Sequence, residues 1–171
     1  YVMAYNQFCS NCGKENAHGY IEGNIRYHCL SCKTIHYENP KPTATLICPQ
    51  KDNILLVKRA FEPGKGLWGL PGGFIELNET PDQGALRELR EETNLNGKVN
   101  HLLGYTCHFN TVFGDILLMA FLVEIDDFSN MIAGDDADDV KLFPISQIPK
   151  LAFSSHQKII EIYLNYLKAL N

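Results

Sequence analysis

The sequence GGFIELNETPDQGALRELREETNL, residues 72–95, carries the strongest local signals in this chain of 171 residues. Its middle has the features of a helix start: Thr80 is a typical N-cap, Pro81 occupies the first helical position and Gln83 completes a capping box. Asn94 tolerates the left-handed conformation that closes many helices. The stretch therefore predicts a helix that begins at Pro81 and ends just before Asn94.

One face of this helix is strongly acidic. Glu88, Glu91 and Glu92 follow the spacing i, i+3, i+4, which places them on the same face. Like charges at this spacing destabilise a helix, so their presence is explained if a cation binds there. Ligation by oxygen alone favours Mg²⁺ or Mn²⁺ over zinc. A solvated acidic face without a metal is the alternative that this spacing leaves open.

The spacing over the whole stretch resembles the Nudix box: Gly73, five residues, Glu79, seven residues and then RELREETNL, residues 87–95. The one departure is Asn94, where the family usually has Gly, and both residues tolerate a left-handed helix end. The resemblance implies an α/β fold of the Nudix type, an α/β/α sandwich with a mixed sheet. It also implies a divalent-metal-dependent hydrolase that cleaves the pyrophosphate bond of a nucleoside diphosphate linked to another moiety.

The same resemblance assigns roles to individual residues. The implied metal-binding positions are the Gly72 carbonyl, Glu88, Glu91 and Glu92. Arg87 matches an arginine that orients a box glutamate, and Glu79 matches a supporting carboxylate. The catalytic base varies within the family. Glu88 is one candidate, and Asp139 or Asp138, on the loop before the last strand, is the other.

Two cysteine pairs precede the box. Cys9-x-x-Cys12 and Cys29-x-x-Cys32 are separated by sixteen residues, a spacing typical of a two-knuckle zinc ribbon. Four thiolates complete a closed tetrahedral site, which is structural rather than catalytic. Two disulfides are the alternative, but the sequence shows no secretory signal that would favour them. The pattern therefore predicts structural Zn²⁺ bound by these four cysteines.

The prolines of the segment HYENPKP, residues 36–42, predict a linker. We therefore expect a zinc ribbon over residues 4–38 and a Nudix hydrolase domain over residues 39–171. A ribbon, this linker and a box together resemble the zinc-ribbon-bearing Nudix hydrolases, a group of FAD- and ADP-ribose-type pyrophosphatases near the NADH pyrophosphatases. Residues 107–113 do not match the SQPWPFP-like signature of NADH pyrophosphatases, which favours ADP-ribose or FAD as substrate over NADH.

Composition bounds the remaining possibilities. The chain has 45% hydrophobic residues, so it can form a packed core, and a formal net charge of -5, which argues against nucleic acid as a partner. No apolar run approaches the roughly 20 residues of a membrane helix, so we expect no membrane partner and a cytoplasmic location. A nucleotide-binding regulatory or interaction module with little hydrolytic activity is the alternative function. The intact acidic positions of the box argue against it.

Other elements follow from periodicity. Residues 43–48 and 53–60 are rich in strand-forming residues around a turn, and we expect them to form a hairpin. Residues 154–170 predict a terminal helix with one buried stripe. That stripe comprises Ile159, Tyr163, Tyr166, Leu167 and Leu170. Ile160, Ile162 and Leu164 lie off it, and we interpret them either as scattered surface residues or as a contact surface of a homodimer.

Overall fold

The computed structural model describes residues 6–134 and 136–170. The chain divides into two compact units, with the boundary between Asn39 and Pro40. In the smaller unit, β1 (Ala17–Ile21) and β2 (Asn24–His28) form an antiparallel hairpin, and β3 (Ile35–His36) pairs with β2.

The larger unit contains a mixed sheet with the strand order β8-β4-β10-β9. The four strands are β8 (Gly72–Phe74), β4 (Lys41–Ile47), β10 (Gly114–Ile125) and β9 (Gly97–Thr111). β4 and β10 are parallel, and the other pairs are antiparallel. β9 and β10 are long strands that pair along most of their length.

A second sheet has the order β11-β6-β5. It contains β11 (Ala137–Pro144), β6 (Asn53–Arg59) and β5 (Pro49–Gln50), and β7 (Trp68–Gly69) also pairs with β6. The expected hairpin between residues 43–48 and 53–60 is wrong, because β4 belongs to the other sheet and only the short β5 pairs with β6. The reason is burial: five consecutive residues of β4 are buried, which requires an interior strand covered on both faces.

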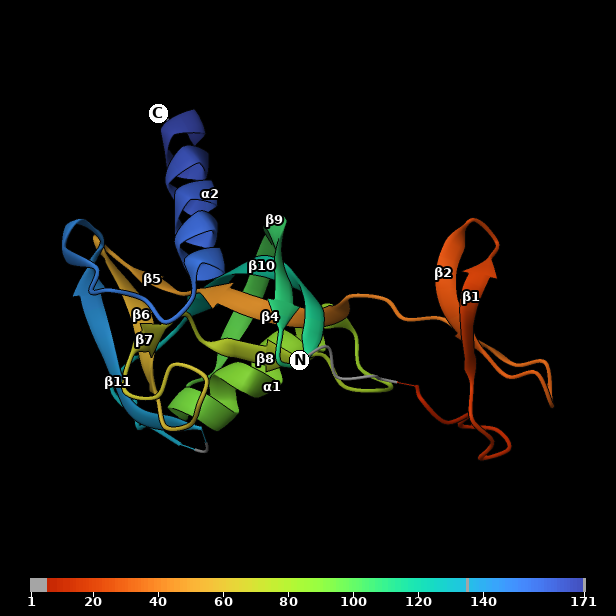
Figure 1. Cartoon of the computed structure of the whole chain (residues 1–171). Coiled ribbons are helices and arrows are strands. Elements are labelled where there is room, and N and C mark those ends of the chain that lie inside the picture. Colours follow the sequence, from red (N-terminus) through yellow and green to blue (C-terminus); the bar gives the residue numbers. More distant parts are fainter. Residues whose placement is uncertain (1–5, 135, 171) are drawn as a thin grey trace. The chain divides into compact units, whose positions relative to one another are not determined.

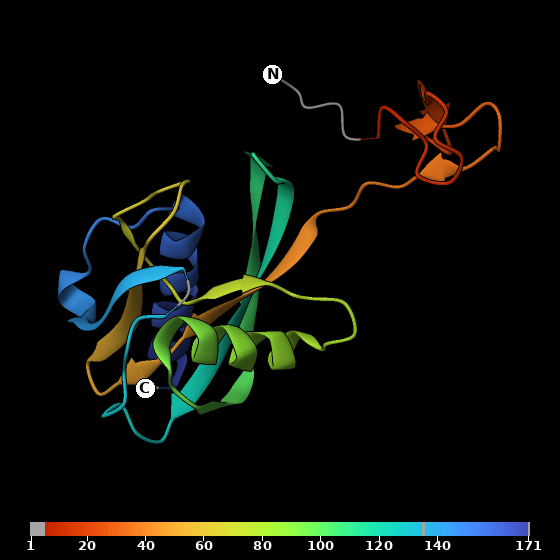
Figure 2. The same ribbon diagram turned by 90° about the horizontal axis from the view of Figure 1, so that it is seen from below.

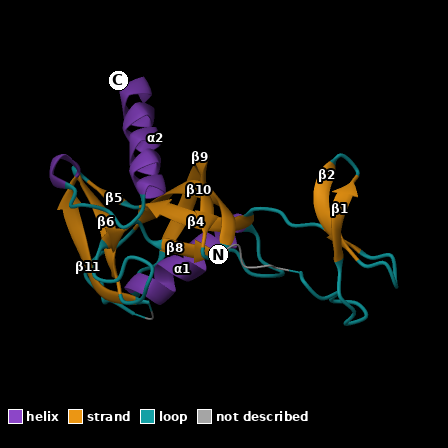
Figure 3. Ribbon diagram, in the orientation of Figure 1, coloured by secondary structure: helices purple, strands orange, loops and turns teal. Residues whose placement is uncertain are grey.

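Helices α1 (Pro81–Thr93) and α2 (Ser154–Leu170) lie on opposite sides of the strands (Figure 1, Figure 2). Successive residues of β4 point to opposite faces of the sheet. Leu46 packs in the hydrophobic cluster that includes residues of α1, and Ile47 packs in the cluster that includes residues of α2. Figure 3 shows the resulting layers, with helices on either side of the strands. A short 3-10 helix, Ile145–Gln147, precedes α2. No helix within the described residues is both long and apolar enough to cross a membrane.

Helix α1 confirms the predicted start and end. The backbone N–H of Thr80 donates to the Gln83 side chain at 2.8 Å, and Asn94 closes the helix in the left-handed conformation with φ 58°. Helix α2 confirms the predicted range, but its buried stripe differs from the prediction. Ile160 is buried with Ile159 and Tyr163, whereas Leu170 is exposed.

The residues that suggested a homodimer pack inside the larger unit. Ile160 and Leu164 belong to the hydrophobic cluster of α2, and Ile162 lies against Gly104 of β9. The reason is that α2 packs on the sheet with a wider face than one stripe. A homodimer therefore stays a prediction, without the surface that first suggested it.

Candidate active site

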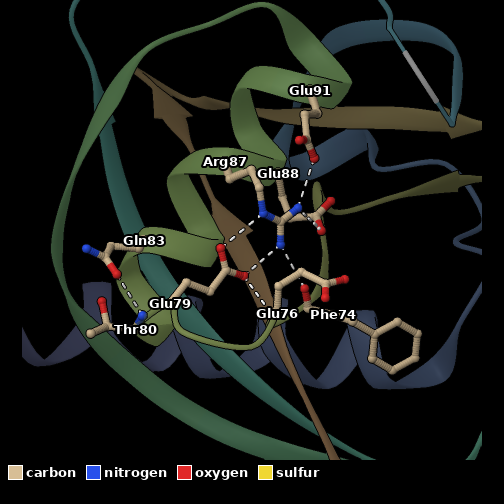
Figure 4. Close-up of polar contacts among 8 residues, drawn as sticks. All are labelled: Phe74, Glu76, Glu79, Thr80, Gln83, Arg87, Glu88 and Glu91. Carbon is tan, nitrogen blue, oxygen red and sulfur yellow. Dashed lines mark hydrogen bonds and ion pairs between the residues drawn. The ribbon is translucent and has the colours of Figure 1, made fainter.

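Arg87 lies at the centre of the box (Figure 4). Its Nη1 donates to Glu88 at 2.8 Å and to Glu91 at 2.9 Å, and the second of these is an i, i+4 pair on helix α1. Its Nη2 donates to Glu79 at 2.8 Å and to the Phe74 carbonyl at 2.9 Å. One guanidinium therefore positions three carboxylates and connects helix α1 to strand β8.

Glu79 is held from two directions. It accepts hydrogen bonds from both Nε and Nη2 of Arg87 and, at 2.6 Å, from the backbone N–H of Glu76. These bonds favour the charged carboxylate, so the Arg87 guanidinium first and the Glu76 N–H second lower the pKa of Glu79 to about 2. Glu79 is therefore a charged support for Arg87 over the whole physiological pH range.

Glu92 is buried, with 8% of its surface exposed. Its carboxylate accepts the backbone N–H of Gly72 at 2.9 Å, and burial raises its pKa to about 8 in spite of that bond. Gly72 has φ 139° and lies so close to β4 that a Cβ atom would overlap the Ala44 carbonyl. Only glycine fits there.

Glu88 lies directly against the glycine turn. A Cβ atom at Gly73 would overlap the Glu88 carboxylate, so a larger residue there would displace the Glu88 side chain. Burial raises the pKa of Glu88, and this effect exceeds the opposing influence of Arg87. The carboxylate is therefore a stronger proton acceptor than an exposed glutamate.

The box carboxylates form an open set in this structure. Among the described residues, the four cysteines are the only group in which three or more ligand atoms lie within 4.8 Å of one another. Glu88 and Glu91 are bonded to Arg87, and Glu92 to the Gly72 N–H. All three line one cavity and offer carboxylate oxygens as ligands. This set of ligands fits a hard divalent ion once Glu91 turns away from Arg87.

The two predicted aspartates lie elsewhere. Asp139 accepts the N–H of Val140 and forms an ion pair with Lys141, and neither Asp139 nor Asp138 lines the cavity. Both lie in β11 and not, as the sequence had suggested, in the loop before it, and Asp136, just before β11, lines the cavity. A role for Asp139 as the base stays a prediction and requires the Lys141 pair to open.

The cavity has a volume of about 830 Å³. Besides the box glutamates, its lining includes aromatic rings, among them Phe61 and the edge-to-face pair of Phe74 and Phe113 at 5.6 Å. Arg59, Phe153, Ser155 and His156 also line it. Sequence reasoning missed these four as site residues, because no motif surrounds them and only the fold brings β6 and the start of α2 to the box.

The cysteines form a second, separate site in the smaller unit. The Cys9 and Cys32 sulfurs lie 3.5 Å apart, as do those of Cys12 and Cys29. The Thr34 side chain lies 3.1 Å from the Cys32 sulfur, and this hydrogen bond lowers the pKa of Cys32 to about 5. The sulfurs form no disulfide and converge as ligands of one ion would, which is compatible with zinc.

Comparison with known proteins shows which sequences this chain resembles. A NUDIX domain model matches residues 39–163. Over 119 residues, the chain is 41% identical to the ADP-ribose pyrophosphatase of Methanocaldococcus jannaschii, covering 68% of this chain and 69% of that protein. It is 26% identical over 147 residues to the NAD-capped RNA hydrolase NudC of Vibrio parahaemolyticus, covering 85% of this chain and 54% of that protein. The chain thus spans about half the length of this NudC relative.

Solved structures agree. A NUDIX hydrolase from Nitrosomonas europaea superposes with a TM-score of 0.81 at 35% identity, covering 95% of this chain and 92% of that one. The NUDIX domain of Shewanella oneidensis NrtR, crystallised with ADP ribose, superposes with a TM-score of 0.66 at 28% identity, covering 77% of this chain and 90% of that one. With the box geometry, the family model and these neighbours in agreement, the chain belongs to the NUDIX family of hydrolases.

Proposed function

We propose that this Nudix hydrolase is a divalent-metal-dependent pyrophosphohydrolase acting on ADP-ribose, or on another nucleoside diphosphate linked to a second moiety. One observation carries the proposal: a single cavity of about 830 Å³ joins the box carboxylates to exposed aromatic rings. Carboxylates that hold cations suit a diphosphate, and aromatic rings suit a base. The volume lies within the range of small-molecule sites, about 300–1,000 Å³.

The comparisons support ADP-ribose among the substrates. The archaeal relative with 41% identity is named for that activity, and the NrtR domain was crystallised with ADP ribose. FAD stays a second candidate. NADH ranks lower, because residues 107–113 differ from the NADH pyrophosphatase signature.

Glu88, Glu91, Glu92 and the Gly72 carbonyl would hold Mg²⁺ or Mn²⁺. A bound divalent ion would neutralise phosphate charge and lower the pKa of a water molecule. Arg87 orients Glu88 and Glu91 through hydrogen bonds, while Gly72 holds Glu92 through its N–H. We assign Glu88 as the base, since burial raises its pKa and it lines the cavity, with Asp139 and Asp138 as alternatives.

We further propose Zn²⁺ at Cys9, Cys12, Cys29 and Cys32, with a structural role. Because the residues carry free thiols, a reducing compartment such as the cytoplasm suits the site. The domain assignment, a zinc ribbon over residues 4–38 and a Nudix hydrolase domain over residues 39–171, is part of the same proposal.

A substrate panel tests the proposed function. The value of kcat/KM is measured for ADP-ribose, FAD, NADH, NAD, diadenosine polyphosphates, nucleoside triphosphates and an NAD-capped oligonucleotide, each with Mg²⁺ and with Mn²⁺. We expect ADP-ribose to exceed the other substrates by about a hundredfold, which corresponds to about 2.7 kcal/mol. A preference for the capped oligonucleotide would overturn both the substrate and the expected absence of nucleic acid.

The alternative function is a nucleotide-binding module. Tight binding of ADP-ribose without turnover of any panel member would favour it. The complete set of acidic box residues argues for hydrolysis, because a binding module has no need of three metal-ligand carboxylates on one helix face.

A further inference from the structure

The cavity contains a polar group that the box chemistry does not use. Ser155 lies at the start of α2, lines the cavity and is only 2% exposed. Its hydroxyl oxygen is buried and has no hydrogen-bond partner among the described residues. A buried polar group without a partner costs about 1–3 kcal/mol, so such a group needs an explanation. A ligand group that binds this hydroxyl would provide one.

His156, the next residue, adds a second donor. It is 9% exposed and lines the same cavity. Its Nδ1 accepts the backbone N–H of Leu70 at 3.0 Å, so the neutral ring carries its proton on Nε2. No acceptor for that proton is found among the hydrogen bonds of residues 6–134 and 136–170. The ring therefore offers an N–H donor at the start of α2.

Arg59, at the end of β6, adds a positive charge. Its Nε donates to the Pro63 carbonyl at 2.7 Å, while its guanidinium carbon lies 5.0 Å from the Phe153 ring centre. The His156 ring is 5.3 Å from the same Phe153 ring, so the two groups are neighbours. Within the described part of the chain, Arg59 has no carboxylate within 4.0 Å and is the one Lys or Arg side chain that lines the cavity.

The N-terminus of α2 reinforces this charge. The first N–H groups of a helix have no partner within the helix, and the helix dipole places partial positive charge there. We infer that Ser155, His156, Arg59 and the N-terminus of α2 form a second subsite, which binds a phosphate group of the nucleotide substrate. The subsite uses other residues of the cavity than the box carboxylates that would hold the divalent ion, and the identity of the substrate rests on the proposed function.

Phosphate fits better than a sugar hydroxyl. The guanidinium, the imidazole Nε2–H and the helix N–H groups only donate hydrogen bonds, and the serine hydroxyl can donate one. A sugar hydroxyl must also donate its own proton, whereas phosphate oxygens only accept. A negative charge gains in addition from Arg59 and the helix dipole.

Calorimetric binding tests this subsite without catalysis. The zinc-loaded protein is dialysed free of Mg²⁺ and titrated with inorganic phosphate, ribose 5-phosphate and AMP. We expect at least one of these phosphates to bind the wild type, and both Ser155→Ala and Arg59→Met to raise its Kd about tenfold or more. Glu91→Gln is the matched control and should not weaken binding, since it changes only the box.

Thermal unfolding checks that the variants are folded. Ser155→Ala removes a hydroxyl without a protein partner, so its Tm should equal or exceed that of the wild type. An unchanged Kd in Ser155→Ala and Arg59→Met, or no phosphate binding at all, would overturn the inference. Loss of binding in Glu91→Gln alone would do the same, because it would place the phosphate at the box. Absence of turnover in the substrate panel would contradict the proposed function and leave this result standing.

Discussion

The two ligand sets of this chain differ in how far the protein has assembled them. In the smaller unit, four cysteine sulfurs lie within 4.8 Å of one another, ready for one ion. In the larger unit, Glu88 and Glu91 are bonded to Arg87, and Glu92 is bonded to a backbone N–H. A closed set of four thiolates leaves no position for a substrate, whereas an open set of carboxylates does.

The two units also differ in what stabilises them. Within residues 6–39, Cys9 and Cys29 are the only buried residues. The larger unit has two hydrophobic clusters, one beneath each helix. We therefore expect the smaller unit to depend on a bound ion for folding, and the larger unit to fold on its core and to need an ion only for chemistry.

Removal of zinc should have the largest effect. Structural zinc contributes about 10–16 kcal/mol of apparent binding energy in small modules, so chelation or the replacement of Cys9 and Cys29 by Ser should unfold residues 6–39. The larger unit should stay folded. Limited proteolysis with mass spectrometry measures the protection of each unit, and Cys107→Ser is the control thiol. Unchanged protease resistance of residues 6–39 would show that the small unit folds without its ion.

Removing the charge of a box carboxylate should have the second largest effect. Glu91→Gln and Glu92→Gln should each lower kcat/KM by about a hundredfold or more, since each removes a charged metal ligand. Without Mg²⁺, Glu92→Gln should unfold at a Tm no lower than wild type, because Gln can still accept the Gly72 N–H and buries no charge. Glu76→Gln, which changes another carboxylate of the cavity lining, is the control. Near-wild-type rates in either box variant would exclude the metal assignment.

The pH dependence of stability should reveal buried His156. Burial, with Arg59 and His108 nearby, lowers its pKa from 6.5 to about 3. Below pH 6.5 the unfolded chain binds a proton that the folded chain excludes, so this contribution to stability is present above pH 6.5 and is lost as the pH falls toward 3. His156 alone should contribute a loss of about 2 kcal/mol between pH 7 and pH 5, while the raised pKa of Glu92 gives an opposing gain over the same interval.

Urea unfolding at the two pH values measures this loss, with His156→Asn as the matched variant. Asn keeps a hydrogen-bond acceptor for the Leu70 N–H but does not titrate. The variant should therefore lose about 2 kcal/mol less than the wild type over the same interval. Identical pH dependence in both proteins would mean that His156 is not the group responsible.

The smallest effect should come from the one departure from the box pattern. Asn94→Gly relieves the left-handed backbone but removes the bond from the Asn94 side chain to the Asn130 carbonyl at 3.1 Å. The two effects are similar in size, so stability should change by less than about 1 kcal/mol, with kcat/KM unchanged. Asn94→Ala has neither the backbone freedom of glycine nor the bond to Asn130, so it should be less stable than both the wild type and Asn94→Gly. A large loss of activity in Asn94→Gly would show that this helix end has a catalytic role.

Local signals predicted the box helix well, because a cap, a first-turn proline and a left-handed closing residue act within a few residues of one another. Strand pairing was less accessible. β4 and β6 are close in sequence, yet β4 pairs with the distant β10. The α2 stripe was predicted too narrow, since how wide a helix face is buried depends on the surface beneath it.

The cysteine pairs, the box helix and its acidic face could be predicted from the sequence, because spacing along the chain sets which of these side chains share a turn or a face. Tertiary structure alone decided the contents of the cavity. It brought Arg59, Ser155 and His156 to the site from segments about a hundred residues apart, and it left Asp139 paired with Lys141 outside the cavity. Such placements follow from how sheets and helices pack, and packing depends on contacts between segments that no local pattern records.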